Sequence, residues 1–366
     1  MHLDFKARLT DEAEVRVGFI GCGSHALRNL YPVLQFVHAD LVATCDLDIR
    51  KAEAAAGTFG AENAYSNHID MLGREDLDAV LICTGYDKSG RPTYPRLASD
   101  CLEAGCHVWF EKPPAATCRE IEAIQDTAAA AGRNAAVGLK KMFFPANEKA
   151  KELMDAETFG DPHLVMCRYP QYVPSVDEFR EYLDDHRANR VRAFLDHLCH
   201  PASLLLFLLG MPDSLYYERS GAGGGLATFR YSSGALASLA LTEGASMNGG
   251  MEHTVIISDR GRHISVANNL RVTLHRSPPV TYGDAPSFYT GTPDDVSAAW
   301  EPEFSLGQLY NKGLFLLGYY NEINEFVRSI LEDRPVLKGT LDQAWQVTRI
   351  FEAFSGGPRT EIPLTS

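Results

Sequence analysis

The chain has 366 residues, of which 45% are hydrophobic and 22% are charged, and its formal net charge is −14 at pH 7. A chain of this length favours two domains, because single hydrophobic cores rarely grow beyond roughly 250 to 300 residues. The acidic charge argues against nucleic acid as a partner, since phosphate binding needs a basic surface, and it favours a small-molecule ligand.

Compartment is suggested by what the sequence lacks and by its cysteines. Residues 1–14 contain no apolar core of the signal-peptide kind, and no uncharged apolar run reaches about 18 residues. The eight cysteines are scattered, without a C-x-x-C pair, and several lie in apolar segments, which favours reduced core thiols. We expect a soluble, cytoplasmic protein that does not bind membranes.

Short apolar strands alternate with helical stretches in the first third of the chain. This pattern is typical of βαβ units and a parallel sheet. Strands are predicted at residues 15–20, 41–45, 79–84, 107–110 and 135–139, and helices at residues 26–36, 49–59, 95–104 and 118–131. We therefore predict a dinucleotide-binding Rossmann domain over residues 1–141.

After about residue 160 the strands become longer and crossovers become rare, which indicates a mostly antiparallel sheet. Strands are predicted at residues 163–169, 226–231, 235–242, 254–258, 263–267 and 270–275, helices at 314–332 and 341–353, and loops at 221–225 and 277–303. The prediction is an α/β protein in which residues 142–366 form a C-terminal α+β domain with a large, open sheet.

The first motif is a G-x-G-x-x-A turn, Gly21, Gly23 and Ala26, between the first strand and the first helix. Gly21 suits a tight turn, Gly23 lets the backbone approach a pyrophosphate, and Ala26 allows close helix packing. The free amides and the positive end of the following helix hold phosphates. Small-residue turns also occur for packing reasons alone, so the turn needs support from its context.

That support comes from Asp46, which closes the second strand 20 positions after Ala26 (46 − 26). An acidic residue there accepts hydrogen bonds from both adenosine ribose hydroxyls and repels a 2′-phosphate, so NAD is favoured over NADP. Arg50 and Lys51 could soften that preference, or they are the solvated face of the next helix. The residues predicted to contact the cofactor are Gly21, Gly23, Ser24, His25, Ala26, Asp46, Arg50, Thr84, Glu111 and Lys112.

Lys112 follows the apolar strand 107–110 and precedes Pro113, which cannot donate to a further ladder bond. Lys112 should therefore lie at a carboxyl end of the sheet, the edge at which open α/β sheets bind ligands. A third motif pairs Asp196 with His200, at i and i+4, on one face if the helix begins by Asp196; Pro201 leaves open a start at residue 200 or 201.

Hydride transfer needs a proton acceptor, a cation that polarises the developing carbonyl and an anion that orients the acceptor. His200, Lys112 and Asp196 fit these roles in that order. Taken singly, a lysine is often a surface residue and such a histidine is often a buried core residue. The combination carries the prediction.

These residues together resemble the glucose-fructose oxidoreductase, inositol dehydrogenase and rhizopine catabolism (Gfo/Idh/MocA) family. The similarity covers most of the chain, in order and at similar spacing: Gly21-x-Gly23-x-x-Ala26, Asp46, Glu111-Lys112-Pro113 and Asp196-x-x-x-His200. It implies a nicotinamide-dependent sugar or polyol oxidoreductase in which Lys112, Asp196 and His200 form the catalytic set. It also implies an open sheet that often mediates assembly, here into a homodimer or homotetramer, and a helix at 341–353 that packs back towards the first domain.

The sequence departs from the family pattern after the third strand. Relatives often have Pro-Asn and then a histidine there, whereas this chain has Gly85-Tyr86 and then Tyr94. Tyr94 takes over a contact near the nicotinamide or merely packs. Leu198 stands where relatives often have glycine, and Ser203 where they often have aspartate.

Polar and aromatic residues gather between residues 168 and 192, just before Asp196. They suit a ring that bears several hydroxyls, and the arginines could clamp a phosphate, carboxylate or nucleotide diphosphate; the alternative is a solvated helix with charge pairs. Lys140 and Lys141 end the fifth strand, and the sequence assigns them no role. The residues predicted to contact substrate are Tyr94, Arg168, Tyr172, Arg187 and Arg192.

His197, Cys199 and His200 are close in sequence, but zinc enzymes need three ligands in defined geometry and no second cluster appears, so we predict no metal. The predicted function is hydride transfer between NAD(H) and a secondary alcohol or ketone of a sugar, sugar derivative or cyclitol. Two alternatives stay open: a redox-assisted glycosidase, lyase or epimerase that regenerates NAD in each cycle, and a non-catalytic NAD-binding sensor.

Overall fold

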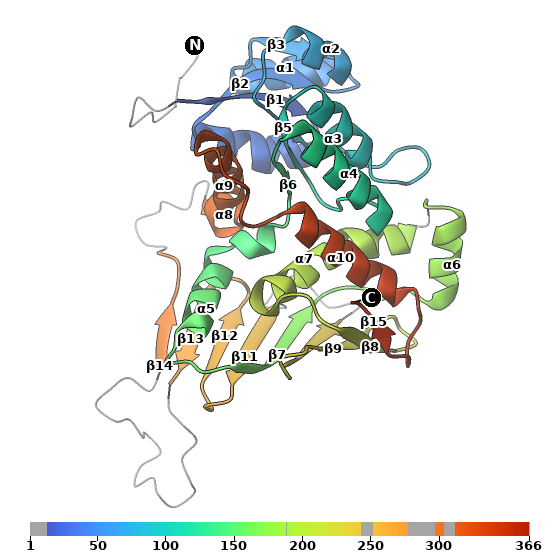
Figure 1. Ribbon diagram of the computed structural model, residues 1–366, viewed down its shortest axis with the longest axis vertical. Coiled ribbons are helices and arrows are strands. Elements are labelled where there is room, and N and C mark those ends of the chain that lie inside the picture. Colours follow the sequence, from blue (N-terminus) through green and yellow to red (C-terminus); the bar gives the residue numbers. More distant parts are fainter. Residues whose placement is uncertain (1–12, 188, 243–251, 277–296, 304–311, 366) are drawn as a thin grey trace, which may run out of the picture. The chain divides into compact units, whose positions relative to one another are not determined.

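The computed structural model describes residues 13–187, 189–242, 252–276, 297–303 and 312–365 (Figure 1). The chain divides into two compact units, and each is described by itself. Unit 1 contains Met1–Phe143, Asp185–Arg187 and Leu317–Thr348, and unit 2 contains Phe144–Asp184, Ala188–Leu316 and Arg349–Ser366. This division differs from a single boundary after residue 141, because Leu317–Thr348 returns to unit 1.

Unit 1 is built on a six-stranded parallel sheet with the order β3-β2-β1-β4-β5-β6. This is the strand order of dinucleotide-binding sheets, and it confirms the predicted parallel fold. The central strands are short runs with buried apolar residues, because helices cover both faces of the sheet. The strands are β1 (Val15–Ile20), β2 (Ala39–Cys45), β3 (Asn63–Tyr65), β4 (Ala79–Ile82), β5 (His107–Phe110) and β6 (Ala135–Val137).

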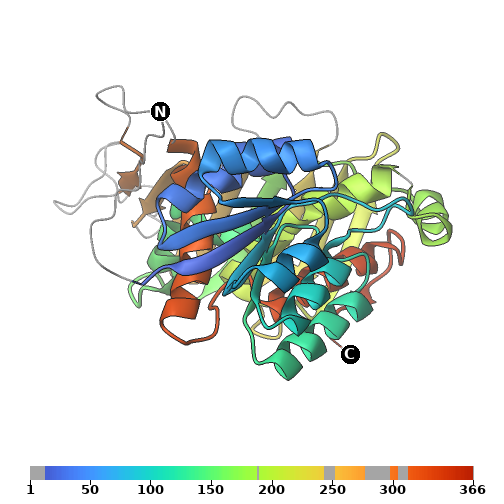
Figure 2. The ribbon, with the colours of Figure 1, turned by 90° about the horizontal axis from the view of Figure 1, so that it is seen from above.

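Four α-helices connect these strands: α1 (Ile49–Phe59), α2 (His68–Arg74), α3 (Tyr94–Glu103) and α4 (Cys118–Ala131). Figure 2 shows α1 on one side of the sheet and α3 and α4 on the other. Helix α4 begins with a capping box between Thr117 and Glu120 and ends at Gly132, which is left-handed. Its predicted bounds are confirmed, because these three residues mark both ends in the sequence.

The predicted helix over residues 26–36 is wrong in type. The segment forms a π-helical turn, η1 (Ala26–Leu30), followed by a 3-10 turn, η2 (Tyr31–Gln35). Pro32 has no backbone N–H to donate to a regular α-helix, which disfavours one continuous helix over this segment.

The C-terminal part of unit 1 consists of α9 (Tyr319–Leu331) and the first turns of α10 (Leu341–Phe354). Trp345 on α10 donates from its indole N–H to Glu122 on α4, 2.9 Å away. The predicted helix over residues 314–332 is divided into α8 (Lys312–Leu316) and α9, because Gly318 between them has a φ of 74°.

Unit 2 is built on a nine-stranded sheet with the order β14-β13-β12-β11-β7-β10-β9-β8-β15. Only β7 and β10 pair in parallel among its described strands, which confirms the mostly antiparallel prediction. The strands are β7 (Pro162–Tyr169), β8 (Ser214–Arg219), β9 (Gly225–Arg230), β10 (Leu236–Leu241), β11 (His253–Ser258), β12 (His263–Ala267), β13 (Arg271–His275), β14 (Ser297–Trp300) and β15 (Ile362–Pro363). Strand β14 falls within the predicted loop over 277–303, and residues 277–296 of that loop lie outside the described residues.

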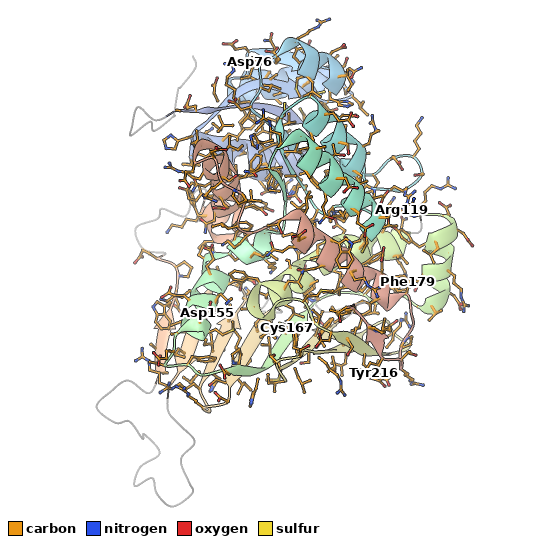
Figure 3. The ribbon with its side chains drawn as sticks, viewed as in Figure 1. Asp76, Arg119, Asp155, Cys167, Phe179 and Tyr216 are labelled. Carbon is orange, nitrogen blue, oxygen red and sulfur yellow. The ribbon has the colours of Figure 1, made fainter. Side chains whose placement is uncertain are left out.

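Helices cover one face of this sheet, with α5 (Pro145–Asp155) and α7 (Asn189–Leu209) lying on it, and α6 (Val176–Asp184) precedes α7 (Figure 1). Side chains alternate along the strands between this face and the bare one. Cys167 on β7 is buried on the helix side, whereas Tyr216 on β8 is exposed on the other face (Figure 3). Met166, Leu226 and Leu236 are exposed on the same bare face.

Helix α7 runs without interruption through Pro201. The possible helix start at residue 200 or 201 is therefore wrong, and Asp196 and His200 lie in the same helix. By length and composition α7 alone among the described helices could cross a membrane, but 67% of its apolar stretch is buried within the protein. All eight cysteines are buried, and none of them forms a disulfide.

Candidate functional site

The glycine-rich turn lies at the carboxyl edge of the unit 1 sheet, between β1 and η1. Gly21 has a φ of 106°, and a Cβ atom there would overlap the carbonyl oxygen of Cys83, so only glycine fits. A Cβ atom at Gly23 would meet no other atom within 4 Å, because this position faces open space. The backbone at Gly23 is therefore free to approach a ligand, as a pyrophosphate requires.

That open space is a cavity of about 690 Å³. Its volume is in the range of small-molecule and cofactor sites. The cavity is lined by Ile20, Gly21, Gly23, Ser24, His25, Ala26, Cys45, Asp46, Leu47, Ser66, Asn67, His68, Cys83, Thr84, Gly85, Tyr86, Thr93, Arg96 and Leu97. Seven residues predicted to contact the cofactor are in this wall: Gly21, Gly23, Ser24, His25, Ala26, Asp46 and Thr84.

Asp46 is held in place by two backbone N–H groups. The N–H of Cys22 donates to Oδ2 at 2.9 Å, and the N–H of Asp48 donates to Oδ1 at 3.0 Å. Each carboxylate oxygen keeps acceptor capacity beyond these bonds. An oriented carboxylate in the cavity wall suits two neighbouring ribose hydroxyls, so the residues present fit NAD.

Arg50 is used elsewhere. Its Nε and Nη2 donate to the two carboxylate oxygens of Asp48, at 3.0 and 2.9 Å, and its side chain is 84% exposed. Asp48 in turn caps the N-terminus of α1. Arg50 does not line the cavity, so this geometry favours its interpretation as a solvated helix residue.

The other end of the glycine turn is linked to the strand that carries Lys112. His25 Nε2 lies 2.9 Å from Glu111 Oε1, and the backbone N–H of Lys112 donates to Glu111 Oε2 at 3.0 Å. Asn29 Nδ2 lies 3.1 Å from the other ring nitrogen of His25. Burial would raise the pKa of Glu111, but the hydrogen bond from His25 and the charge of Lys112 outweigh it, and the pKa is lowered. Glu111 is therefore an ionised carboxylate between the cavity wall and Lys112.

Lys112 is half-buried at the end of β5, and its peptide bond to Pro113 is cis. The neighbouring strand, β6, leads into a 3-10 turn, η3 (Lys140–Phe143), in which Lys141 is buried. Lys140 Nζ donates to Tyr319 Oη on α9 at 2.9 Å. Tyr319 was not predicted, since 179 residues separate it from Lys140 and no local pattern connects them.

Tyr94 is only 3% exposed. Its hydroxyl donates to the carbonyl oxygen of Thr84 at 2.7 Å, and its ring stacks on Phe110 with centroids 5.9 Å apart. This environment favours the packing role for Tyr94. The neighbouring Thr93 lines the cavity instead, and its hydroxyl lies 2.7 Å from that of Thr84.

In unit 2, helical spacing puts Asp196 and His200 on one face of α7. The ring of Tyr169 on β7 lies 6.2 Å from that of His200, centroid to centroid. Burial and then the charges of Glu252 and Asp196 raise the pKa of Tyr169. Tyr169 was not among the predicted site residues, although its strand directly precedes them.

Pro201 leaves the carbonyl of His197 without the usual helical donor. His197 Nε2 lies 3.5 Å from Asp196 Oδ2, and the Ser203 hydroxyl donates to the carbonyl oxygen of His200 at 3.0 Å. Cys199 is buried, and its thiol donates to the carbonyl oxygen of Leu195. Within the described residues, no group of three or more His, Cys, Asp or Glu side chains could hold a metal ion.

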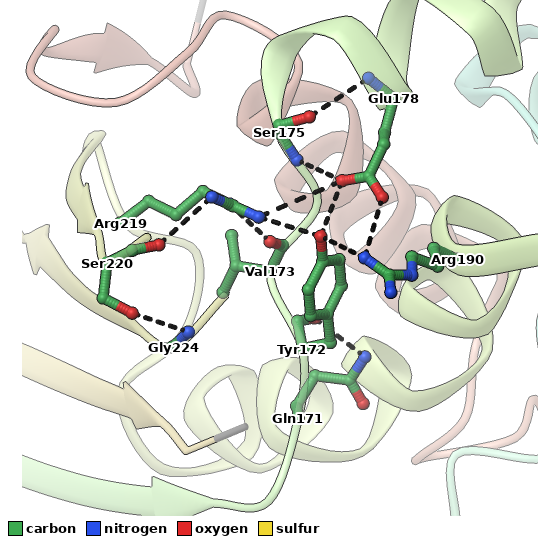
Figure 4. Close-up of polar contacts among 9 residues, drawn as sticks. All are labelled: Gln171, Tyr172, Val173, Ser175, Glu178, Arg190, Arg219, Ser220 and Gly224. Carbon is green, nitrogen blue, oxygen red and sulfur yellow. Dashed lines mark hydrogen bonds and ion pairs between the residues drawn. The ribbon is translucent and has the colours of Figure 1, made fainter. Parts of the chain in front are cut away.

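Tyr172, predicted to contact substrate, lies in a dense polar cluster (Figure 4). Its hydroxyl accepts from Arg190 Nη1 at 2.9 Å and from Arg219 Nη2 at 2.8 Å. It donates to Glu178 Oε2 at 2.8 Å. These bonds occupy the hydroxyl, so the geometry favours a structural role.

The three predicted arginines are dispersed. Arg168 is exposed on β7 between the buried Cys167 and Tyr169, so it points to the bare face of the sheet, away from His200. Arg187 Nε and Nη2 donate to Asp185, and Arg192 Nη2 donates to Asn189 Oδ1 at 2.6 Å. Arg187 and Arg192 are thus each bonded to a residue close to them in the sequence.

Comparisons with known proteins cover both units. Residues 15–139 match the model described as "Oxidoreductase family, NAD-binding Rossmann fold", and residues 147–262 match the C-terminal domain model of the same Gfo/Idh/MocA family. Inositol 2-dehydrogenase 3 of Saccharopolyspora erythraea is 29% identical over 216 residues, which are 52% of this chain and 62% of that protein. The match therefore spans less than two thirds of this relative.

Solved structures show the same fold. A dehydrogenase from Chromobacterium violaceum has a TM-score of 0.75 at 23% identity, with 93% of this chain and 94% of that chain covered. A scyllo-inositol dehydrogenase from Lactobacillus casei, solved with NAD(H) and scyllo-inositol, has a TM-score of 0.70 at 20% identity, with 96% and 100% covered. With both family models matched in order along the chain, the protein belongs to the Gfo/Idh/MocA family of oxidoreductases, which has an NAD-binding Rossmann fold.

Proposed function

We propose that the protein is a soluble, cytoplasmic oxidoreductase that transfers a hydride between NAD(H) and a secondary alcohol or ketone of a sugar, a sugar derivative or a cyclitol. The observation that carries this proposal is the hydrogen-bonded path from the cavity wall to Lys112. His25 lines the cavity and contacts Glu111, which accepts from the backbone of Lys112. A group at the end of the cavity is thereby connected to the lysine at the sheet edge.

The residues divide the chemistry between them. NAD, when bound, supplies the hydride acceptor at its nicotinamide ring. In the oxidation, His200 accepts the hydroxyl proton, Lys112 stabilises the oxygen as it becomes a carbonyl, and Asp196 orients the imidazole. The reduction uses the same groups in reverse.

The test is a dehydrogenase screen of cyclitols, sugars, sugar phosphates and nucleotide sugars with NAD and NADP. On the substrate found, Lys112→Ala should lower turnover about a hundredfold or more, as expected for loss of an electrostatic or acid–base group. Lys151→Ala, which removes a lysine paired with Asp155 on α5, is the matched control and should leave turnover unchanged. Full activity of Lys112→Ala would refute the role given to Lys112. Stoichiometric release of NADH separates a dehydrogenase from an enzyme that regenerates NAD in each cycle.

We also propose that the chain assembles into a homodimer or homotetramer through the bare face of the unit 2 sheet. The support is the row of exposed large apolar side chains on that face, Met166, Tyr216, Leu226 and Leu236, since exposed apolar patches mark interaction surfaces. Leu226→Lys should shift the sedimentation coefficient towards that of the monomer. Leu183→Lys is the control, because Leu183 is also exposed but lies on α6. An unchanged assembly in the Leu226 variant would exclude this face.

A further inference from the structure

Lys140 is a cation at the carboxyl edge of the unit 1 sheet that the proposed mechanism does not use. It begins the turn η3 directly after β6, and β6 pairs with β5, the strand that ends at Lys112. Its ammonium donates to Tyr319 Oη at 2.9 Å. Among the residues that the structure describes, no carboxylate lies within 4 Å of Lys140. An ammonium has three donors, so two remain for another partner.

Charges of both signs face Lys140, and among them the ionised carboxylate of Glu111 has the largest effect on it. Glu111 and Lys112 face it from the end of β5, Lys141 from its own turn, and Tyr319 and Glu322 from α9. Glu111 is ionised, but it is already bonded to His25 and to the backbone of Lys112. Lys338, which follows α9, adds a further positive charge beside Glu322.

Glu322 is the second carboxyl in this cluster, and its burial disfavours its ionised form. It is 2% exposed, and neither of its carboxylate oxygens has a hydrogen-bond partner. Burial and then the charge of Glu111 raise the pKa of Glu322 well above its ordinary value, although the charges of Lys140 and Lys338 oppose this. Burial also lowers the pKa of Lys140, and although Glu111 opposes this, Lys112 and Lys141 add to the lowering. An anion bound beside Lys140 would stabilise its charged form.

Resting on the function proposed above, we propose that Lys140 binds an anionic substituent of the substrate, a carboxylate or a phosphoryl group carried by the sugar or cyclitol. A half-buried cation with no carboxylate in direct contact is costly, and an anionic ligand at the ligand-binding edge would lower that cost. Lysine pairs with either group as a point charge. In this proposal Lys112 still stabilises the reacting oxygen, and Lys140 determines which polyhydroxy compounds bind well.

The cofactor diphosphate is the competing anion, and the turn at Gly21 and Gly23 already provides for it. The two possible ligands of Lys140, the cofactor diphosphate and an anionic substrate group, predict different effects when Lys140 is replaced. If Lys140 held the diphosphate, Lys140→Met would weaken NAD binding and would affect acidic and neutral substrates alike. If it holds the substrate, NAD affinity stays constant and only the preference for acidic substrates is lost.

The experiment compares matched neutral and anionic compounds, with wild type, Lys140→Met and Lys140→Arg. The set is glucose with glucuronate and glucose 6-phosphate, galactose with galacturonate and galactose 6-phosphate, and myo-inositol with an inositol monophosphate. We expect wild type to favour at least one anionic compound over its neutral counterpart by tenfold or more in kcat/KM. Lys140→Met should abolish this preference mainly through KM, and Lys140→Arg should retain it. The better of the uronate and the phosphate identifies the group.

Calorimetric titration of the same compounds gives a readout that does not need turnover. Anionic compounds should bind wild type at least tenfold more tightly than neutral ones, and Lys140→Met should remove the difference while leaving the NAD dissociation constant unchanged. If wild type bound anionic and neutral compounds equally tightly, or if Lys140→Met bound NAD more weakly, the role proposed for Lys140 would be wrong. Absence of NADH formation from every compound, with anionic preference still seen in binding, would instead count against the proposed oxidoreductase function.

Discussion

The glycine turn of unit 1 and the Tyr172 cluster of unit 2 both have the residue types expected of a ligand site. Of these two regions, the turn borders a cavity with hydrogen-bonding groups available to a ligand. In unit 1, the backbone geometry forms the site: Gly21 allows the turn, and backbone N–H groups orient Asp46 in the cavity wall. In unit 2, Arg190 and Arg219 donate hydrogen bonds to the Tyr172 hydroxyl, which itself donates to Glu178. Polar residues indicate a site when their neighbours leave them capacity, and neighbours are a property of the fold.

The strongest effect on this contrast is expected from Gly21→Ala. The added Cβ meets the Cys83 carbonyl, and alanine is strained at a φ of 106°, so unit 1 should lose at least about 3 kcal/mol of stability and NAD binding should be abolished. Gly23→Ala is the matched variant, because its Cβ meets nothing within 4 Å. It should keep the melting temperature but weaken NAD binding. Calorimetric melting and NAD titration separate the two, and normal NAD affinity in Gly23→Ala would place the pyrophosphate elsewhere.

Asp46→Ala should weaken NAD binding by about tenfold to a hundredfold, roughly 1.4–2.7 kcal/mol, since two ribose hydroxyls lose their acceptor. NADP affinity should stay the same or improve, because the repulsion of a 2′-phosphate is removed. Arg50→Ala is the control and should change neither affinity, as Arg50 is bonded to Asp48. Dissociation constants for both cofactors test this. A large loss of NADP binding in Arg50→Ala would restore Arg50 to the cofactor site.

Local signals explain how much of the fold could be predicted. Helix α1 matches its prediction to the residue, because Asp48 caps its start and left-handed Gly60 ends it. Prolines were less reliable. Pro32 lies in the first turn of the 3-10 segment η2, whereas Pro201 is accommodated inside α7, where the apolar face buried by neighbouring elements outweighs one lost hydrogen bond.

The candidate site divides in the same way. Gly21 and Asp46 were identified because a backbone motif specifies its own geometry at short range. The cluster of Lys140, Tyr319 and Glu322 joins segments about 180 residues apart, with Lys140 to Tyr319 separated by 179 positions. No periodicity or spacing reports such a contact. Tyr172 is the opposite case: its residue type suggested a substrate contact, whereas its hydroxyl is hydrogen-bonded to Glu178, Arg190 and Arg219.

Glu322 allows a test in which two glutamates on α9 should respond in opposite directions. Burial and the charge of Glu111 raise the folded-state pKa of Glu322, so its stabilising contribution is present below pH 4.5 and is lost as the pH rises through that raised pKa. Glu322→Gln removes this loss. The variant should be more stable than wild type at pH 8, by about 1–3 kcal/mol as for relief of a buried unsatisfied group, and the gain should vanish towards pH 4.

Glu325→Gln is the matched control for this variant. Burial would raise the pKa of Glu325, but hydrogen bonds from Arg334 at 2.8 and 3.0 Å outweigh it and lower the pKa. Its stabilisation is therefore present above pH 4.5 and lost as the pH falls through the lowered pKa. The variant should be less stable than wild type at pH 8, and the two should converge in acid. Urea unfolding at pH 4, 6 and 8 measures both; a loss of stability in Glu322→Gln at pH 8 would show that Glu322 is ionised and paired.

The smallest effect is expected from Tyr172→Phe, which tests the closed side of the contrast. The ring still packs between Arg190 and Arg219, whose guanidinium carbons lie 4.7 and 5.4 Å from its centroid, but three hydrogen bonds to the hydroxyl are lost. Because Arg190 is mostly exposed and water can replace part of the network, the loss should be about 1 kcal/mol of unfolding free energy. NAD affinity and KM should not change if the cluster is structural. A raised KM at unchanged stability would instead make Tyr172 the substrate contact that its residue type suggested. The Tyr172 cluster and the glycine turn would then both be ligand sites, and they would differ only in the ligand that each binds.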